Sequence, residues 1–110
     1  MPKTKSNIAP PSPAEMAVAA GLACNLLKIL ANPDRLLIMC HLSMGESCVS
    51  DLEINLGIRQ PTLSQQLAVL RSQDLVATRR EGKNIFYSIA STEALAVMAV
   101  VYEQFCPKAK

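Results

Sequence analysis

The sequence predicts a mainly α-helical domain with a β-hairpin wing, that is, a winged helix-turn-helix in which four helices precede the hairpin and a fifth follows it. Three observations support this fold class. Hydrophobic residues make up 50% of the 110 residues and aromatic residues only 4%, so the core is built from aliphatic side chains that favour helices. Two short amphipathic helices follow each other across a tight turn, and a hairpin pattern comes directly after them. A chain of this length is expected to form one domain.

The start of the chain predicts a flexible arm over residues 1–12 and a folded domain over residues 13–107. The arm contains three prolines and little hydrophobic sequence. Ser12 followed by Pro13 is a helix-start signal, because serine caps helices well and proline is favoured at the first helical position. We expect this Ala-rich helix to continue to about Leu30.

The second helix is predicted by a repeat of the same signal, an asparagine followed by proline at Asn32-Pro33. The stretch from Asp34 to Met44 is apolar on nearly every side, which is typical of a helix buried in the middle of a domain. Gly45 is expected to end it.

The helix-turn-helix follows. Its first helix is predicted from Ser50 to Leu56, and Gly57 closes it. After a short turn, Pro61 begins the recognition helix. One side of that helix carries a leucine stripe with helical spacing, formed by Leu63, Leu67 and Leu70. The opposite side is polar, so we expect it to face outward.

The wing and the last helix complete the predicted domain. The hydrophobic period changes to that of strands at residues 75–80 and again at residues 84–89. Between them Glu81-Gly82-Lys83 predicts the turn of a hairpin. A last apolar helix begins at Ser91 or Thr92, and Pro107 stops it.

Positive charge is concentrated in one segment, although the whole chain carries only +2. Residues 1–58 hold four basic and five acidic side chains, residues 59–84 hold five and two, and residues 85–110 hold two of each. Such an asymmetry is expected of a surface that meets phosphate, whereas a solvated charged turn is the simpler alternative.

The outer side of the recognition helix predicts contacts with double-stranded DNA. Glutamine can pair bidentately with adenine, and serine or threonine can bond several base edges. Basic side chains before the helix and on the wing suit the phosphate backbone or the minor groove. The predicted DNA-binding residues are Arg59, Gln60, Thr62, Ser64, Gln65, Gln66, Arg79, Arg80 and Lys83.

A homodimer is predicted because a helix-turn-helix commonly reads two half-sites about 34 Å apart. The first and last helices are too apolar to face water, so we expect them to form the dimer surface. The alternative is that these two helices pack on each other within one chain.

The location of the protein is expected to be cytoplasmic, without membrane contact. The first residues contain no apolar core of a signal peptide, and no apolar run approaches the roughly 20 residues needed to span a bilayer.

Four cysteines in a cytoplasmic protein are more typically buried, metal-binding or redox-reactive than joined in a disulfide framework. The spacing of Cys24, Cys40, Cys48 and Cys106 contains no Cys-x-x-Cys pair and His41 is the only histidine, so we predict no metal site and no cofactor. Each cysteine taken alone is most simply a small buried hydrophobe. However, Cys40 and Cys106 both precede helix ends on elements expected to pack together, which would bring their thiols close.

The order of elements and several short stretches resemble the ArsR/SmtB family of winged-helix repressors over about residues 22–106. The matching stretches are Asn32-Pro33-x-Arg35-Leu36, Gln60-Pro61-Thr62-Leu63-Ser64-Gln65-Gln66-Leu67, Leu70-Arg71 and Phe86-Tyr87. The Q-P-T-L-S-Q-Q-L run and the terminal Phe105-Cys106 are most similar to the BigR/SqrR persulfide-sensing branch, and HlyU is a near relative.

This resemblance implies a transcriptional repressor that senses reactive sulfur. Members of the branch use two cysteines, one in the second helix and one in the last, which implies Cys40 and Cys106. The reduced homodimer would bind operator DNA and release it when persulfides or polysulfides link the two thiols. Cys24 and Cys48 have no counterpart. The metal ligands of other branches have no match, because the helix before recognition reads Ser50-Asp51-Leu52-Glu53 and the last helix lacks histidine.

Three other readings stay open at this point. One is a metal-responsive repressor of the same fold that uses some of the four cysteines with His41. A second is a HlyU-like activator that displaces a nucleoid protein. A thiol enzyme is the third, and we discount it because His41 lies next to Cys40 in sequence and so points about 100° away on a helix. We therefore expect a protein that is not an enzyme.

Overall fold

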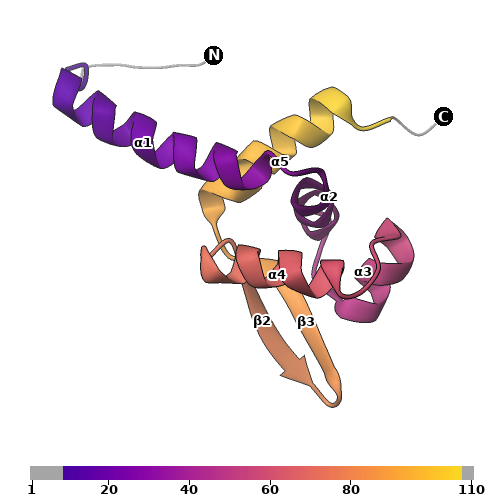
Figure 1. The fold of residues 1–110 in the computed structure, drawn as a ribbon. Coiled ribbons are helices and arrows are strands. Elements are labelled where there is room, and N and C mark those ends of the chain that lie inside the picture. The colour runs from indigo at the N-terminus through magenta and orange to yellow at the C-terminus, as the bar shows by residue number, and fades with distance from the viewer. Residues whose placement is uncertain (1–8, 108–110) are drawn as a thin grey trace.

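The computed structural model describes residues 9–107, so the first eight residues of the expected arm lie outside it. The hairpin extends away from the helices below α4, and α1 and α5 lie at the opposite side of the molecule (Figure 1). The predicted winged helix-turn-helix is confirmed. Its elements in chain order are α1 (Pro13–Leu30), α2 (Pro33–Leu42), β1 (Ser47–Cys48), α3 (Val49–Leu56), α4 (Thr62–Ser72), β2 (Val76–Glu81), β3 (Asn84–Ile89) and α5 (Thr92–Phe105).

The first two helices begin where their caps predict. The Ser12 hydroxyl accepts a hydrogen bond from the backbone N–H of Glu15 at 3.1 Å, and the Glu15 carboxylate accepts one from the backbone N–H of Ser12 at 2.8 Å. In the same way, Asn32 Oδ1 accepts the backbone N–H of Arg35 at 3.1 Å. These bonds satisfy N–H groups that have no partner inside a helix, and they fix where each helix starts.

The turn of the helix-turn-helix depends on Gly57. Its φ of 69° lies in the left-handed region, which costs glycine nothing and most other residues a steric clash. Its N–H donates to the Glu53 carbonyl, which closes α3. The chain can then turn directly into α4, as the glycine at this position predicted.

The core surrounds α2, which is seen nearly end-on at the centre of Figure 1 and packs against α1, α3, α4, α5 and β3. The leucine stripe of α4 is buried, as predicted, against the apolar side of α2. The largest fully buried side chains are Ile38, Met39, Leu52, Leu63, Leu67, Leu70 and Met98. A movement of α2 is therefore transmitted to most of the domain, because close-packed cores do not deform freely.

The wing belongs to a three-stranded antiparallel sheet in the order β1-β3-β2. β1 was not expected, because two residues carry no readable strand period; it pairs Ser47 with Tyr87 and Cys48 with Phe86. The hairpin turn contains two residues rather than three, since Glu81 pairs with Asn84. Gly82 supplies the positive φ that this tight turn needs.

α1 corrects one expectation about apolar runs. Its 18 residues have a mean hydropathy of 1.4, which makes it a candidate membrane span by length and composition alone. Sequence reasoning missed this because it looked for an unbroken apolar run, and the apolar residues of α1 are interrupted by Glu15, Asn25 and Lys28. A single helix of this kind is weak support for a membrane span, and the same helix is the expected dimer surface.

Candidate nucleic-acid interface and thiol pair

The outer face of α4 carries short polar side chains. Ser64 and Gln65 are exposed and Thr62 is half-buried in the first turn, opposite the buried leucine stripe. Gln60, in the preceding turn, accepts hydrogen bonds through Oε1 from the backbone N–H of Ser64 at 3.1 Å and from its hydroxyl at 2.6 Å. Gln60 therefore orders the start of α4, because the residue at the cap position, Pro61, makes no side-chain cap.

Gln66 differs from the other predicted DNA-binding residues of α4. It is half-buried, and its Oε1 accepts a hydrogen bond from Arg35 Nη1 of α2 at 3.0 Å. Gln66 therefore faces α2, and its carbonyl oxygen is not available for a base edge. Sequence reasoning placed it on the flank of the outward face because the partner lies 31 residues earlier and leaves no local signal.

Arg79 of the wing is engaged within the protein. Its Nε donates to both carboxylate oxygens of Glu46 at 3.0 and 3.1 Å, its Nη1 donates to Glu81 at 3.0 Å, and its guanidinium lies 4.7 Å from the centre of the Phe86 ring. The hydrogen bond and charge of Arg79 lower the pKa of the Glu46 carboxyl below its usual value. Arg79 pairs with Phe86 in the middle of the hairpin, so it lies away from the hairpin turn.

The other basic residues predicted to meet DNA are exposed. They lie on the turn before α4 and at the end of the hairpin: Arg59, Arg80 and Lys83. A surface with polar side chains on a helix and cations on both flanks suits a DNA groove with its two phosphate backbones. Sequence reasoning did not include Arg71, which is exposed at the last turn of α4 and lines an open hollow with Ser64 and Tyr87.

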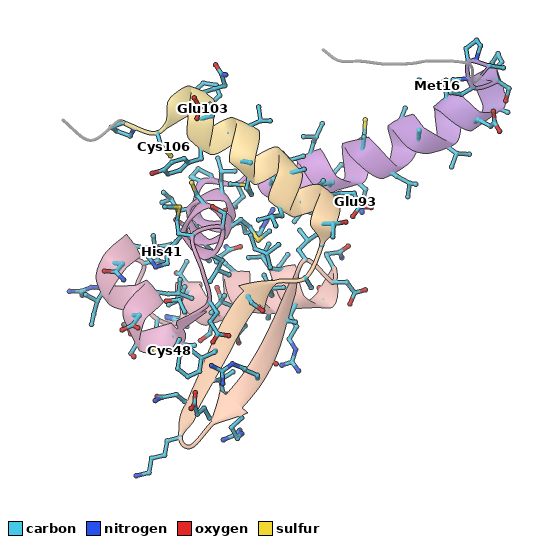
Figure 2. The ribbon with its side chains drawn as sticks, turned by 180° about the vertical axis from the view of Figure 1, so that it is seen from behind. Met16, His41, Cys48, Glu93, Glu103 and Cys106 are labelled. Carbon is cyan, nitrogen blue, oxygen red and sulfur yellow. The ribbon has the colours of Figure 1, made fainter. Side chains whose placement is uncertain are left out.

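The second candidate site is a pair of thiols between α2 and α5. Cys40 Sγ and Cys106 Sγ lie 3.6 Å apart, both cysteines are free, and both are half-buried. Figure 2 shows Cys106 at the C-terminal end of α5, above α2. Cys106 follows the last residue of α5, where its N–H still donates to the Tyr102 carbonyl at 3.1 Å. The helix end therefore orients the thiol toward Cys40.

Burial, together with the hydrogen bond and the charge of Cys106, raises the pKa of the Cys40 thiol to about 11. Cys40 is therefore a neutral thiol at neutral pH. A small hollow of about 260 Å³ adjoins it. The residues that line this hollow beside Cys40 are Leu37, His41, Met44, Leu56 and Tyr102.

Residues 32–78 match the family described as "Bacterial regulatory protein, arsR family". The biofilm growth-associated repressor of Agrobacterium fabrum is 53% identical over 81 residues, which cover 74% of this chain and 69% of that protein. The chain belongs to the arsR family. The resemblance on which the sequence analysis relied is therefore confirmed. Proteins of the family are DNA-binding transcriptional regulators rather than enzymes, which also confirms that no catalytic role is to be expected.

Further relatives of this arsR-family chain include both repressors and an activator. The crystal structure of the repressor BigR from Xylella fastidiosa superposes with a TM-score of 0.83 at 42% identity, covering 89% of this chain and all of that one. The transcriptional activator HlyU of Vibrio cholerae is 40% identical over 98 residues, 89% of this chain and 91% of that protein. The homodimeric winged helix-turn-helix DNA-binding domain Mb0332 of Mycobacterium bovis has a TM-score of 0.67 at 33% identity, covering 87% of this chain and 88% of that one.

The other two cysteines of this arsR-family chain lie on different elements. Cys24 is exposed on α1, whereas Cys48 is buried at the start of α3 with its Sγ 3.3 Å from Ser50 Oγ. Figure 2 shows Cys48 near the hairpin and Cys106 at the far end of α5. Within residues 9–107, no three side chains of His, Cys, Asp or Glu are grouped closely enough to hold a metal ion.

Proposed function

We propose that this arsR-family regulator is a homodimeric transcriptional repressor whose affinity for operator DNA is set by the Cys40–Cys106 pair. The observation that carries the proposal is the 3.6 Å contact between the two Sγ atoms, which joins α5 to the central helix α2. The reduced protein binds DNA and blocks transcription. Reactive sulfur species link the two thiols, and the linked protein releases the DNA.

DNA reading is assigned to α4 and the wing. Thr62, Ser64 and Gln65 lie on the outer face of α4, where they meet base edges in the major groove. Arg59, which precedes the helix, meets the flanking phosphates together with the exposed wing residues Arg80 and Lys83. Gln60 acts mainly by ordering the first turn of α4, and Gln66 and Arg79 act through their protein partners.

The homodimer is supported by the apolar side chains that α1 and α5 leave exposed. Residues of this kind on a water-facing surface mark an interaction site. They are Met16, Val18, Leu22, Leu27, Leu95, Val100, Tyr102 and Phe105. The homodimeric relative from Mycobacterium bovis agrees with this assignment.

The dimer surface is tested with Leu22→Glu, which places a charge on α1 where the side chain is 71% exposed. We expect this variant to sediment as a monomer and to bind a two-half-site operator much more weakly. Ile54→Glu is the matched control, because Ile54 is 78% exposed on α3, away from both apolar helices. An unchanged dimer in Leu22→Glu would reject α1 as the interface.

The sulfur chemistry balances with a persulfide donor, R–S–S–H. Cys106 attacks first, because the raised pKa of Cys40 keeps that thiol neutral. Cys106 Sγ takes the terminal sulfur of the donor and releases R–S⁻, which accepts the proton that Cys106 gives up. A second donor adds another sulfur in the same way, giving Cys106–S–S–SH. Cys40 then attacks the sulfur next to Cys106 Sγ and releases hydrosulfide, which accepts the Cys40 proton. In sum, two protein thiols and two persulfides give one trisulfide bridge, two R–SH and one H₂S.

The distance between the thiols favours a bridge that contains inserted sulfur. Two S–S bonds of about 2.05 Å each place the end atoms of a trisulfide roughly 3.3 Å apart. That span is close to the 3.6 Å between the sulfur atoms of the reduced pair. A plain disulfide requires the sulfur atoms to approach to about 2.05 Å. Persulfides are therefore expected to link the pair more readily than peroxide.

Bridging affects DNA binding through α2. The bridge ties the end of α5 to α2, which packs against α3, α4 and β3. A change in the tilt of α2 alters the spacing of the two recognition helices in the dimer. Allosteric effects of this kind are typically about 1–3 kcal/mol, or roughly 5–150-fold in affinity.

The deciding experiment combines intact-protein mass spectrometry with a DNA mobility shift. A persulfide donor is expected to add one sulfur and remove two hydrogens across the peptides that hold Cys40 and Cys106, with loss of DNA binding. Cys40→Ser and Cys106→Ser should remain on DNA after the same treatment, whereas Cys24→Ser should behave as the wild type. Release of DNA from Cys40→Ser would overturn the proposal.

A second candidate function is transcriptional activation, favoured by the 40% identity to the activator HlyU. In that case the protein binds beside a promoter without covering it and removes an inhibitory DNA-binding protein. A reporter with the operator placed upstream distinguishes the two functions, because a repressor lowers its output and an activator raises it. A zinc or arsenite titration of the reduced protein tests the metal-responsive reading: DNA release by the metal ion without persulfide would favour it.

A further inference from the structure

Arg35 connects three helices through hydrogen bonds. It lies in the first turn of α2 and is half-buried. Its Nε donates to the Ile29 carbonyl at the end of α1 at 2.7 Å, and its Nη1 donates to Gln66 Oε1 on α4 at 3.0 Å. Its backbone N–H is held by the Asn32 cap at 3.1 Å. Because Nε and Nη1 each donate to a different helix, the orientation of the guanidinium plane is fixed.

The same short helix carries the thiol pair at its other end. Cys40 follows Arg35 by five residues, which is about 7.5 Å along a helix axis. Ile38 and Met39, between them, are fully buried, so α2 moves as one rigid element within the core. A displacement of α2 at Cys40 therefore also displaces the guanidinium of Arg35.

The contact with Gln66 differs in kind from the rest of the α2–α4 interface. The interface is otherwise built from apolar residues of the core, including Ile38 and Leu67, and such contacts have little directional preference. A charged guanidinium bound to an amide oxygen is both stronger and directional, since it depends on the angle of the N–H group. This bond therefore fixes the orientation of α4 relative to α2.

The contact with Ile29 extends the connection to the expected dimer helix. The last four carbonyls of a helix have no partner within it, and Arg35 satisfies one of these at the end of α1. The side chain of Arg35 thus belongs to α2, which carries Cys40, and bonds both α1 and the recognition helix α4.

We propose that Arg35 is a positioning residue that transmits the state of the Cys40–Cys106 pair to α4 through its hydrogen bond to Gln66. This inference rests on the proposed thiol control of DNA binding and names the residue pair through which that control acts. In the reduced protein the bond holds α4 in the DNA-binding orientation. Bridging tilts α2. The hydrogen bond between Arg35 and Gln66 then either breaks or rotates α4, and the affinity for DNA falls.

The test uses substitutions at Gln66 with matched chemistry. Gln66→Leu removes the acceptor at nearly constant volume, and Gln66→Glu retains an acceptor oxygen for Arg35. For each variant the dissociation constant for operator DNA is measured in the reduced and in the bridged form, with bridging verified by intact mass. The readout is the ratio of the two constants.

Gln66→Leu is expected to reduce this ratio at least fivefold relative to the wild type although its thiols still bridge completely, and Gln66→Glu is expected to restore it. Arg35→Met should also reduce the ratio, and the double variant Arg35→Met/Gln66→Leu should be no worse than either single variant, because both remove the same bond. A merely structural role would weaken both forms alike and leave the ratio unchanged, which would overturn the inference. If the wild type itself shows no difference between its two forms, the proposed thiol control fails and Arg35 loses this role with it.

Discussion

Cys40 Sγ and Cys106 Sγ lie in van der Waals contact at 3.6 Å although 66 residues separate them in sequence. The contact joins the central helix to the last helix at a point close to the surface.

The first prediction concerns the acidity of Cys40. Because burial and Cys106 raise its pKa to about 11, alkylation of Cys40 by iodoacetamide should accelerate about tenfold for each pH unit between 7 and 10, as the thiolate fraction does. Peptide mass spectrometry after short pulses measures this rate, with exposed Cys24 as an internal reference. Cys106→Ala should move the profile of Cys40 to lower pH. A profile that is flat above pH 8 would contradict the assignment.

The second prediction separates two neighbouring arginines of the wing. Arg80→Ala should reduce the slope of log affinity against log salt by about 1, because a phosphate contact is lost. Arg79→Ala should change that slope much less, since Glu46 and Glu81 already balance the Arg79 charge. DNA titrations by fluorescence anisotropy at several salt concentrations give both slopes. Equal slope changes would show that Arg79 leaves Glu46 for the DNA.

The third prediction is a pH dependence of the wing. Arg79 lowers the pKa of Glu46 in the folded protein, so the stabilisation from this pair is present above the unfolded value of about 4.3 and is lost as the pH falls through the lower folded value. The protection of the β2 amides from hydrogen exchange, relative to the intrinsic rate at the same pH, should therefore decrease below about pH 4. Glu46→Gln should show the faster exchange already at pH 7. Identical exchange in the variant and the wild type at pH 7 would exclude this anchoring role.

The fourth prediction concerns the leucine stripe. Leu67 is 1% exposed between α4 and α2, so Leu67→Ala should reduce the free energy of unfolding by about 2–5 kcal/mol through lost burial and the remaining cavity. Val69→Ala, at a position 37% exposed on the same helix, should cost less than about 1 kcal/mol. Urea unfolding at one fixed protein concentration measures both, because dimerisation contributes to the stability. A loss of similar size at both positions would contradict the packing.

Most of the fold could be predicted because its signals are local. Ser12-Pro13 and Asn32-Pro33 mark helix starts within a few residues, so α1 and α2 begin where expected. Gly57 marks a helix end, so α3 ends where expected. β1 could not be predicted, because a two-residue strand is defined only by its partner in β3.

The candidate sites also combine features with local sequence signals, which could be predicted, and contacts between distant residues, which could not. The outward side chains of α4 follow from helical periodicity, but the contacts of Gln66 with Arg35 and of Arg79 with Glu46 join residues 31 and 33 positions apart. No local pattern encodes such contacts, so the protein partners of these two residues could not be predicted from the sequence. The thiol pair was expected from the placement of two cysteines near helix ends and from the family resemblance.

The short strand β1 has a consequence for the behaviour of the protein at high concentration. An unpaired strand edge is a template on which other chains can add strands and aggregate. β1 covers the outer edge of β3 at Phe86 and Tyr87, where that strand is aromatic. The rest of the hairpin carries Arg80, Glu81 and Lys83 toward its tip, and charges on an edge oppose intermolecular pairing. A wing that must stay exposed to reach its target is thereby kept from becoming a nucleus for aggregation.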